Sequence, residues 1–374
     1  MLSRRAAPGL IGALALLLAA CTAGGSPPAA SRPAAPPTAA STAAPADAPA
    51  APAPAAPPAL LQVKMAAVPN SLSHSGRYVA MERGYFRDEG IDFEEVPFDT
   101  SAKMLPALAA GQVDMAVGGM SAGLFNAIAQ GIPVRIVMDS TSAPPGDSAG
   151  GLLARKDLVD SGQLRDVRDL RGMRAGITSK GQSTEWMLAT ALSQVGLSLA
   201  DVEVNELAYP DMVIGLANRN TDVAVLIEPF GAQAVSQGSA VRFKDWGDVL
   251  PNDHMAMVMY SAAFAQEQTD AGRRYAKAYV RGIRDYVAAR NQGRDREAII
   301  AILMKYSGLR NREIFDQMTW IPLDPDGRVN PATVAAAQDW FADQGYVRTK
   351  VDMAQVLDNQ FVDYAVAQLG PYRQ

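Results

Sequence analysis

The sequence is poor in residues that form covalent or metal crosslinks, since its 374 residues include one cysteine and two histidines. A single cysteine cannot form a disulfide within the chain, so we expect the hydrophobic core to supply the stability. The same scarcity leaves no zinc site by ligand spacing, and we expect neither a metal nor another cofactor. We find no phosphate-cradling Gly-Lys-Ser/Thr loop and expect no nucleophile elbow of a serine hydrolase, hence no catalytic residues and no enzyme.

An excess of positive charge is also missing. The chain has 34 lysines and arginines against 39 aspartates and glutamates, a formal net charge of −5. Without Arg4 and Arg5 the net charge falls to −7. This mild acidity argues against a nucleic-acid partner and against a basic membrane-binding face.

One long apolar run is present, from Gly9 to Ala20, directly after Arg4 and Arg5. It is typical of a secretory signal and too short to span a bilayer comfortably, so we expect a signal peptide over residues 1–20. The stretch Leu-Ala-Ala-Cys that ends at Cys21 resembles the lipobox of bacterial lipoproteins, in which the cysteine receives a diacylglycerol. The chain is therefore expected to be extracytoplasmic and lipid-anchored, either in a periplasm or on the outer face of a single membrane.

An Ala- and Pro-rich segment follows, and Arg32 and Asp47 are its only charged residues between Thr22 and Ala59. Such a composition has no face that could pack, and indicates a semi-extended tether over residues 21–59. At about 3.1 Å per residue, this tether would reach at most about 120 Å from its anchor.

From residue 60 onward, strand and helix patterns alternate. Apolar or alternating runs at 61–68, 91–98, 113–119 and 134–139 predict strands, and helical spacing separates them. This order is typical of parallel strands covered by helices. The same order returns after residue 173, and the strand pattern at 254–261 is expected to rejoin the first sheet. We therefore predict one lobe from residues 60–148 plus 255–374 and a second from residues 149–254.

Two segments of the chain echo each other at a fixed offset of 108 residues. One segment is residues 107–119, and the other begins at residue 215. Aligned without gaps, they share a leucine, two alanines, a valine and an aspartate, and the alignment places Asp114 on Asp222. We interpret the echo as one helix-to-strand unit used once in each lobe, with chance reuse of a common phrase as the alternative. Later in the chain, a helical stripe predicts buried core side chains: Tyr275, Tyr279, Ile283, Tyr286 and Val287.

Four phrases in order carry a family resemblance: "GYFRDEGIDFEEV", "ALAAGQVDMAVGG", "GITSKGQSTEWMLATALSQVGL" and "TDVAVLIEPF". Together they resemble the substrate-binding proteins of ABC importers in the nitrate, aliphatic sulfonate, taurine and thiamine-pyrimidine-precursor class, over about residues 62–345. The resemblance implies an α/β fold of the type II periplasmic binding proteins. That fold has two lobes, each a mostly parallel sheet flanked by helices, and here a C-terminal helical extension. It further implies a monomer that binds a small polar or anionic metabolite and delivers it to a permease in the cytoplasmic membrane.

Ligands of open parallel sheets collect beyond the carboxyl ends of the strands, near helix N-termini. Four loops meet this condition, namely those after the strands at 61–68, 113–119, 173–177 and 222–227. We expect ligand contacts from Asn70, Ser71, Ser73, His74, Gly119, Met120, Ser121, Ser179, Gln182, Ser183, Thr184, Trp186 and Glu228.

Several of these residues have a structural alternative. Ser121 could cap a helix, Trp186 could pack between helix and sheet, and His74 could be a surface residue. The ligand's charge stays open: Lys180 and free helix N-termini favour an anion, whereas Glu228 favours an amine or a zwitterion unless it serves the helix that begins near Pro229.

Binding is expected to close the lobes by hinge rotation at the crossings near residues 143–151 and 251–255. Two other classes of function remain open. One is an enzyme on the same fold, of the pyrimidine-forming or menaquinone-pathway type, although the cysteine-rich motif of the pyrimidine-forming enzymes is absent. The other is a sensory module that presents its ligand to a receptor.

Overall fold

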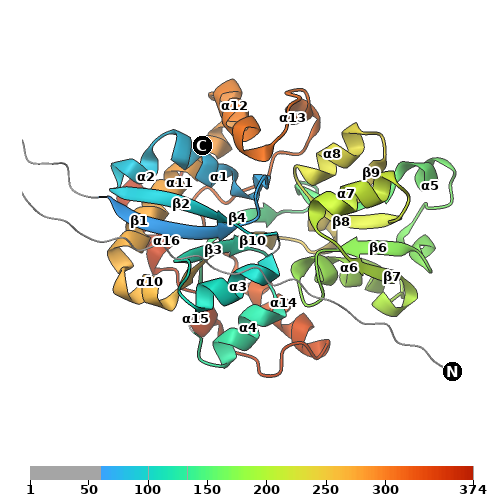
Figure 1. Cartoon of the computed structure of the whole chain (residues 1–374), viewed down its shortest axis with the longest axis horizontal. Helices are drawn as coiled ribbons and strands as arrows, with labels where there is room; N and C mark the ends of the chain where they lie inside the picture. The colour runs from blue at the N-terminus through green and yellow to red at the C-terminus, as the bar shows by residue number, and fades with distance from the viewer. Residues whose placement is uncertain (1–59, 100, 133, 374) are drawn as a thin grey trace, which may run out of the picture. The chain divides into compact units, whose positions relative to one another are not determined.

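The computed structural model describes residues 60–99, 101–132 and 134–373 (Figure 1). The predicted signal peptide, Cys21 and the tether lie outside these residues. Among the helices that are described, none combines the length and the apolar character needed to cross a membrane.

The folded body contains two five-stranded sheets, each flanked by helices (Figure 1). The first sheet has the order β2-β1-β3-β10-β4 and the second the order β7-β6-β8-β5-β9. The strands of the first sheet are β1 (Leu61–Ala67), β2 (Ile91–Pro97), β3 (Met115–Gly118), β4 (Val134–Ala143) and β10 (Asp253–Ser261). Those of the second are β5 (Gly150–Arg155), β6 (Arg174–Ile177), β7 (Glu203–Glu206), β8 (Val223–Ile227) and β9 (Ala240–Asp245). We call the parts built on these sheets the first and second lobe.

Both sheets are mostly parallel, and each contains one strand that runs against its neighbours. In the first sheet this strand is β10, which pairs antiparallel with β3 and β4. In the second it is β5, which pairs antiparallel with β8 and β9. The chain passes from one sheet to the other between β4 and β5, and returns between β9 and β10.

Helices cover both faces of the first sheet. The helices before β5 are α1 (Ser75–Glu82), α2 (Tyr85–Asp88), α3 (Ser101–Ala109) and α4 (Ala122–Ala129). Val63 and Met65 of β1 pack with the α1 side of the sheet, whereas Ala66 packs with α3 and α4. The strand is apolar where helices cover both of its faces, whereas Leu61, Gln62 and Lys64 near its start are exposed. The helices of the second lobe are α5 (Lys156–Asp160), α6 (Ser183–Ser193), α7 (Tyr209–Ala217), α8 (Phe230–Ser236) and α9 (Trp246–Val249).

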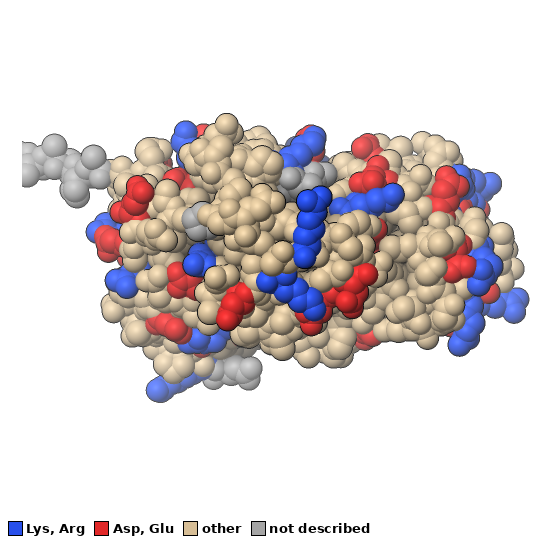
Figure 2. Space-filling model, turned by 90° about the horizontal axis from the view of Figure 1, so that it is seen from below, with Lys and Arg blue, Asp and Glu red and all other residues tan. Residues whose placement is uncertain are grey.

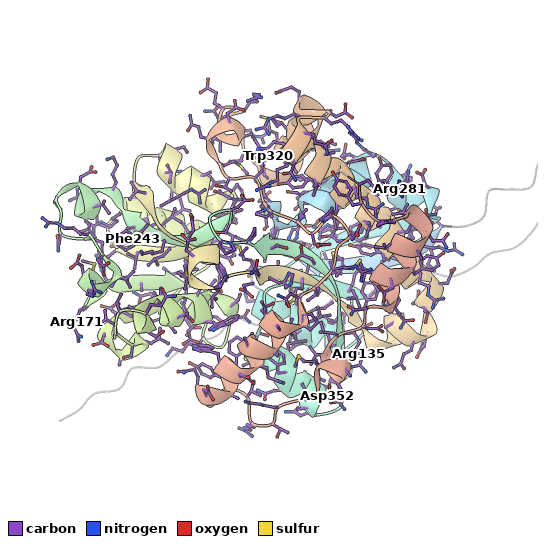
Figure 3. All side chains as sticks on the ribbon, turned by 180° about the vertical axis from the view of Figure 1, so that it is seen from behind. Arg135, Arg171, Phe243, Arg281, Trp320 and Asp352 are labelled. Carbon is purple, nitrogen blue, oxygen red and sulfur yellow. The ribbon has the colours of Figure 1, made fainter. Side chains whose placement is uncertain are left out.

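The C-terminal extension is helical, as predicted. It comprises α10 (Ala262–Glu267), α11 (Thr269–Gln292), α12 (Arg296–Ser307), α13 (Ile314–Gln317), α14 (Pro331–Asp343), α15 (Met353–Val356) and α16 (Gln360–Leu369). The predicted stripe of α11 is buried, with Tyr275 and Ile283 fully inaccessible. Trp320, labelled in Figure 3, stacks on Tyr286 with ring centroids 5.5 Å apart. The extension also contacts both lobes, because α14 packs against α4 and α6.

The echoed segments occupy equivalent places. The strands β3 and β8, which contain the two copies, are each third in their sheet. The Asp114 carboxylate accepts the Lys64 N–H at 2.8 Å, and the Asp222 carboxylate accepts the Arg174 N–H at 2.9 Å. In return, the N–H groups of Asp114 and Asp222 donate to the carbonyls of Lys64 and Arg174, each at 2.9 Å. Each aspartate therefore fixes the start of its own strand, β3 or β8, against the neighbouring parallel strand, β1 or β6.

Candidate ligand-binding site

A cavity of about 600 Å³ lies between the two lobes. The first lobe lines it with Val68, Pro69, Asn70, Asp99 and Lys103, and the second with Thr178, Glu206, Leu207, Ala208, Pro210, Asp211 and Phe230. Most of these residues directly follow the C-terminal ends of β1, β2, β6, β7 and β8. This is the place where ligands of open α/β sheets collect, so the cavity is the candidate site.

Of the predicted ligand contacts, Asn70 lines this cavity. Its backbone has a φ of 61°, in the left-handed region that asparagine tolerates better than most residues. Thr178 belongs to a predicted loop and also lines the cavity. Thr184 supports it, because its Oγ1 lies 2.7 Å from Thr178 Oγ1 and accepts the Thr178 N–H at 3.1 Å. Ser179 donates to the carbonyl of Lys180 in the same loop.

Two of the predicted loops bind each other across the lobe boundary. Residues 119–122 and 181–183 form an isolated antiparallel bridge between Ser121 and Gln182. The Ala122 N–H donates to the Gly181 carbonyl at 2.8 Å, and the Ser183 N–H donates to the Met120 carbonyl at 3.0 Å. We call this pair of segments the interlobe bridge. Its residues are not among those that line the cavity, so the structure places them at a lobe-to-lobe contact.

Ser121 has the geometry of a helix cap. It precedes α4 with φ −147° and ψ 151°, and its Oγ accepts the Leu124 N–H at 3.2 Å. Residues 119–123 read Gly-Met-Ser-Ala-Gly, which matches the G-x-S-x-G pattern, so the expectation that no such motif occurs is wrong at the level of sequence. A nucleophile elbow requires a strained turn and a base beside the serine. Both described histidines make their hydrogen bonds elsewhere.

Trp186 and Glu228 are buried in the second lobe. Trp186 is 6% exposed and belongs to the hydrophobic core. The Glu228 carboxylate is fully buried, accepts the Ala232 N–H at 2.9 Å and pairs with Arg242, whose pKa is lowered by burial. Its position therefore corresponds to the structural alternative, in which the carboxylate stabilises the start of α8.

The loop after β1 folds inward. The Ser71 hydroxyl accepts the Ser73 N–H, and the Ser73 carbonyl accepts a hydrogen bond from Ser140. His74 is 3% exposed and its Nε2 lies 3.2 Å from the Val68 carbonyl. Burial lowers the pKa of His74 well below its usual value, and the charge of Arg77 adds to this, so the imidazole is neutral at pH 7. The surface position considered for His74 is wrong, because the ring packs edge-on against Tyr78.

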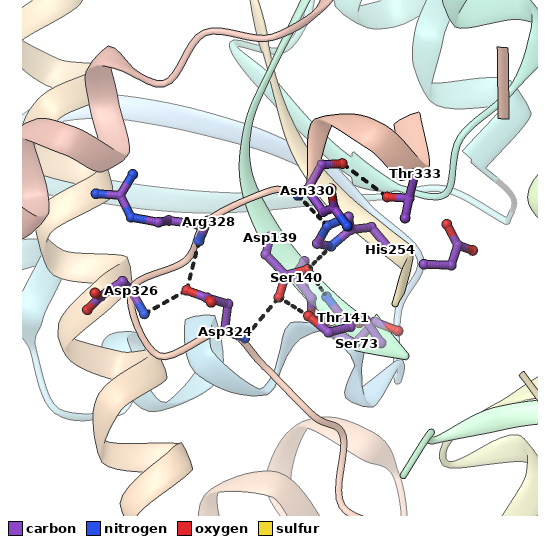
Figure 4. A network of polar contacts seen from close by, with 12 residues as sticks. Ser73, Asp139, Ser140, Thr141, His254, Asp324, Asp326, Arg328, Asn330 and Thr333 are labelled. Atoms are coloured by element: carbon purple, nitrogen blue, oxygen red, sulfur yellow. Dashed lines mark hydrogen bonds and ion pairs between the residues drawn. The ribbon is translucent and has the colours of Figure 1, made fainter. Parts of the chain in front are cut away.

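A buried polar network lies where the chain crosses between the sheets (Figure 4). The Asp139 carboxylate of β4 bonds to His254 Nδ1 of β10 at 2.8 Å and accepts the Asp324 N–H at 3.1 Å. The Asn330 N–H donates to His254 Nε2 at 2.7 Å, so the ring carries its proton on Nδ1. Sequence reasoning treated His254 only as a strand residue. Its hydrogen-bond partners lie 115 and 76 positions away in the sequence. A local sequence pattern cannot predict contacts between residues so far apart.

Sequence reasoning also missed Glu206 and Asp211. Glu206 is the last residue of β7, Asp211 follows the loop after that strand, and both line the cavity. The rule that selected the four predicted loops applies equally to this one, so the signal was present in the sequence. No cluster of three or more His, Cys, Asp or Glu side chains able to hold a metal occurs within the described ranges.

The surface in Figure 2 shows basic and acidic side chains interspersed on that face of the molecule. This distribution agrees with the mixed composition of the chain and gives that face no extended basic stripe of the kind that binds nucleic acid.

Comparisons with known proteins identify relatives. The family described as "NMT1/THI5 like" matches residues 71–292. The chain is 27% identical over 269 residues to the "Putative aliphatic sulfonates-binding protein" of Escherichia coli (strain K12), covering 70% of this chain and 77% of that protein. It is 30% identical over 240 residues to the "Riboflavin-binding protein RibY" of Chloroflexus aurantiacus, covering 62% and 64%.

Solved structures share the fold. The periplasmic nitrate-binding protein NrtA of Synechocystis PCC 6803 superposes with a TM-score of 0.67 at 13% identity, covering 83% of this chain and 89% of that one. The desulfurization enzyme DSZB superposes with a TM-score of 0.58 at 15% identity, covering 83% and 99%. The fold therefore includes an enzyme as well as binding proteins. Since the family match covers more than half of the chain, the protein belongs to the NMT1/THI5-like family and has the fold of the periplasmic binding proteins of ABC import systems.

Proposed function

We propose that this protein is the extracytoplasmic solute-binding component of an ABC importer. It captures a small metabolite in the interlobe cavity and delivers it to a permease. The observation that carries the proposal is the cavity itself, which is lined by strand-end loops from both sheets. Its volume of about 600 Å³ suits a small molecule.

The proposed mechanism is closure of two lobes, residues 60–148 with 255–374 and residues 149–254. The ligand favours the closed state through its contacts with the second lobe, because only a difference in affinity between two states shifts their populations. Asn70 and Thr178 are the proposed ligand contacts among the predicted loops. The interlobe bridge and the Tyr346 hydroxyl, which donates to Glu185 at 3.0 Å, hold the lobes together in the closed state.

We further propose that Cys21 is lipidated and anchors a monomer at the outer face of the cytoplasmic membrane or within the periplasm. This part rests on the signal and lipobox in residues 1–21 and on the relatives, which are binding proteins. Mass spectrometry of the mature protein from membranes, compared with a Cys21→Ser variant, tests it. A diacylglyceryl mass on an N-terminal cysteine is expected.

The test of solute binding is a thermal-shift screen of the Cys21→Ser protein against alkanesulfonates, nitrate, taurine, aminopyrimidines and riboflavin. A ligand at 100 times its Kd stabilises the native state by about 2.7 kcal/mol, which is visible as a higher Tm. Small-angle scattering of each stabilised sample should then show a more compact molecule. Chemical turnover of a stabilising solute would instead favour the enzyme alternative, because the enzyme DSZB has the same fold.

A further inference from the structure

We propose that the interlobe cavity selects a flat ligand that presents positive charge or hydrogen-bond donors, and discriminates against sulfonates and nitrate. The inference rests on the proposed function, because it assumes that the ligand occupies this cavity. It concerns the charge of the ligand, which the names of the relatives leave open.

The ionisable residues that line the cavity are mostly acidic. They are Asp99, Lys103, Glu206 and Asp211, and none of the described lining residues is an arginine. Lys103 Nζ bonds to Asp99 at 2.6 Å, so the single lysine is neutralised by its own neighbour. This leaves the carboxylates of Glu206 and Asp211 as the excess charge, and both belong to the second lobe.

At two helices near the boundary, α4 and α6, N-terminal N–H groups already have acceptors. A helix N-terminus binds anions only through free N–H groups. At α4, the Ala122 N–H donates to the opposite lobe and the Leu124 N–H to Ser121. At α6, the Ser183 N–H likewise donates across the boundary.

Two further helices at the cavity, α7 and α8, have carboxylates at their starts. Glu228 accepts an N–H of α8, and Asp211 lies in the first turn of α7. The negative charge of each carboxylate therefore compensates the positive N-terminal end of the helix dipole beside it. Among the described lining residues, an anionic ligand would therefore find no arginine and would lie beside two carboxylates.

Apart from Asn70 and Thr178, the rest of the cavity wall is apolar and partly flat. Phe230 lines it and stacks on Tyr209, with ring centroids 5.3 Å apart and planes 16° apart. Pro69, Leu207 and Pro210 add apolar surface. A planar group can pack on such a wall, and an aromatic face attracts a cation electrostatically.

Three probes that share one ring and differ in charge test the inference: benzamidine (cationic), benzamide (neutral) and benzoate (anionic). Calorimetry with the Cys21→Ser protein should give the order benzamidine, benzamide, benzoate from tightest to weakest. The double variant Glu206→Gln with Asp211→Asn should weaken benzamidine about tenfold, the size expected for removing charges at contact distance near a protein surface, and leave benzamide within about twofold.

Glu203→Gln is the matched control. Glu203 begins the same strand, is exposed, and is absent from the cavity lining, so its loss should leave all three affinities unchanged. The inference is overturned if benzoate or an alkanesulfonate binds the unsubstituted cavity as tightly as benzamidine. It is equally overturned if the double variant binds benzamidine normally, or if benzamidine gives no binding at millimolar concentration.

Small-angle scattering separates failure of this inference from failure of the proposed function. Closure of the lobes around an anion would leave the binding function intact and overturn only the charge assignment. Selective binding of benzamidine without closure would support the charge assignment and contradict the lobe-closure mechanism.

Discussion

Gly119 lies at a point where the two lobes touch. A Cβ at this position would come within 2.3 Å of Ser183 Oγ and 3.1 Å of the Met255 carbonyl. The hydroxyl can rotate away, but the carbonyl belongs to the backbone and cannot yield as easily. A side chain at residue 119 would thus press on Ser183 of the second lobe and also on Met255 of the first lobe.

We expect Gly119→Ala to disfavour the closed state by about 1–3 kcal/mol, the usual cost of overpacking a close contact. Ligand affinity should fall by the corresponding factor, as measured by calorimetry. Gly123→Ala is the control, because the nearest atom would be 3.5 Å away in ordinary contact. Equal affinities in the two variants would show that Gly119 does not limit closure.

Glu228 offers a second test at the scale of one residue. Its carboxylate is buried against Arg242 and the Ala232 N–H. We expect Glu228→Ala to lower the free energy of unfolding by about 1–3 kcal/mol, since it leaves buried polar groups without a partner. Urea denaturation measures this, with Glu94→Gln at an exposed ion pair as a near-neutral control. If ligand affinity fell and stability did not, the carboxylate would be a ligand contact after all.

Asp253 makes stability depend on pH. Its side chain is fully buried, one oxygen accepts the Trp246 indole N–H at 2.8 Å, and burial raises its pKa to about 6. The folded protein therefore holds this proton more tightly than the unfolded chain does, so the stabilising contribution is present below about pH 4 and is lost as pH rises through about 6.

Asp253→Asn removes this titration. The variant should gain stability relative to the parent protein as pH rises from 4 to 7, by up to about 3 kcal/mol. Urea unfolding at several pH values measures the difference between the two proteins, which cancels the contribution of every other carboxylate. A difference that stays constant over this range would contradict the assignment.

At the scale of elements, the two echoed helix–strand units differ in how strongly their aspartates are held. Asp114 accepts one backbone N–H. Asp222 accepts the equivalent N–H and also pairs with Arg155 and Arg174. The two units thus share one backbone contact, and the second also contains an ion-pair network.

We therefore expect Asp222→Ala to cost more than Asp114→Ala. Losing one hydrogen bond at Asp114 should lower the free energy of unfolding by about 1 kcal/mol, whereas leaving two arginines without their buried partner Asp222 should cost about 3 kcal/mol. Equal midpoints in urea would mean that the ion pairs add nothing beyond the shared hydrogen bond.

The sequence predicted the elements better than it predicted their partners. Strands such as β3 and β8 and the buried stripe of α11 follow from local periodicity, which depends on near neighbours in the chain. The loops at strand ends were also located correctly. Which loop faces which could not be deduced, because the Ser121 to Gln182 bridge and the His254 to Asp139 bond join residues far apart in sequence.

At the scale of the whole molecule, the interlobe bridge offers a way to lock the two lobes. Directly opposed residues of an antiparallel pair have Cα atoms about 4.5–5.5 Å apart, which suits a disulfide. We expect Ser121→Cys with Gln182→Cys, in the Cys21→Ser protein, to form a disulfide on oxidation and to block ligand exchange until reduction. Stopped-flow fluorescence measures the exchange rate, and Ser121→Cys alone is the control. Unchanged exchange in the oxidised double variant would show that solute enters without separation at the bridge.

The placement of β10 sets an order of assembly. This strand lies between β3 and β4, yet it follows the entire second sheet in the chain. A chain that emerges N-terminus first presents β1 to β4 before the strand that joins β4 to them, whereas β5 to β9 form an unbroken run. The second lobe can therefore complete its sheet from contiguous chain, and the first must wait for a strand that arrives more than a hundred residues after β4 begins. During that interval the unpaired edges of β3 and β4 are exposed, which makes the first lobe the part of the newly synthesised chain that depends on protection from aggregation.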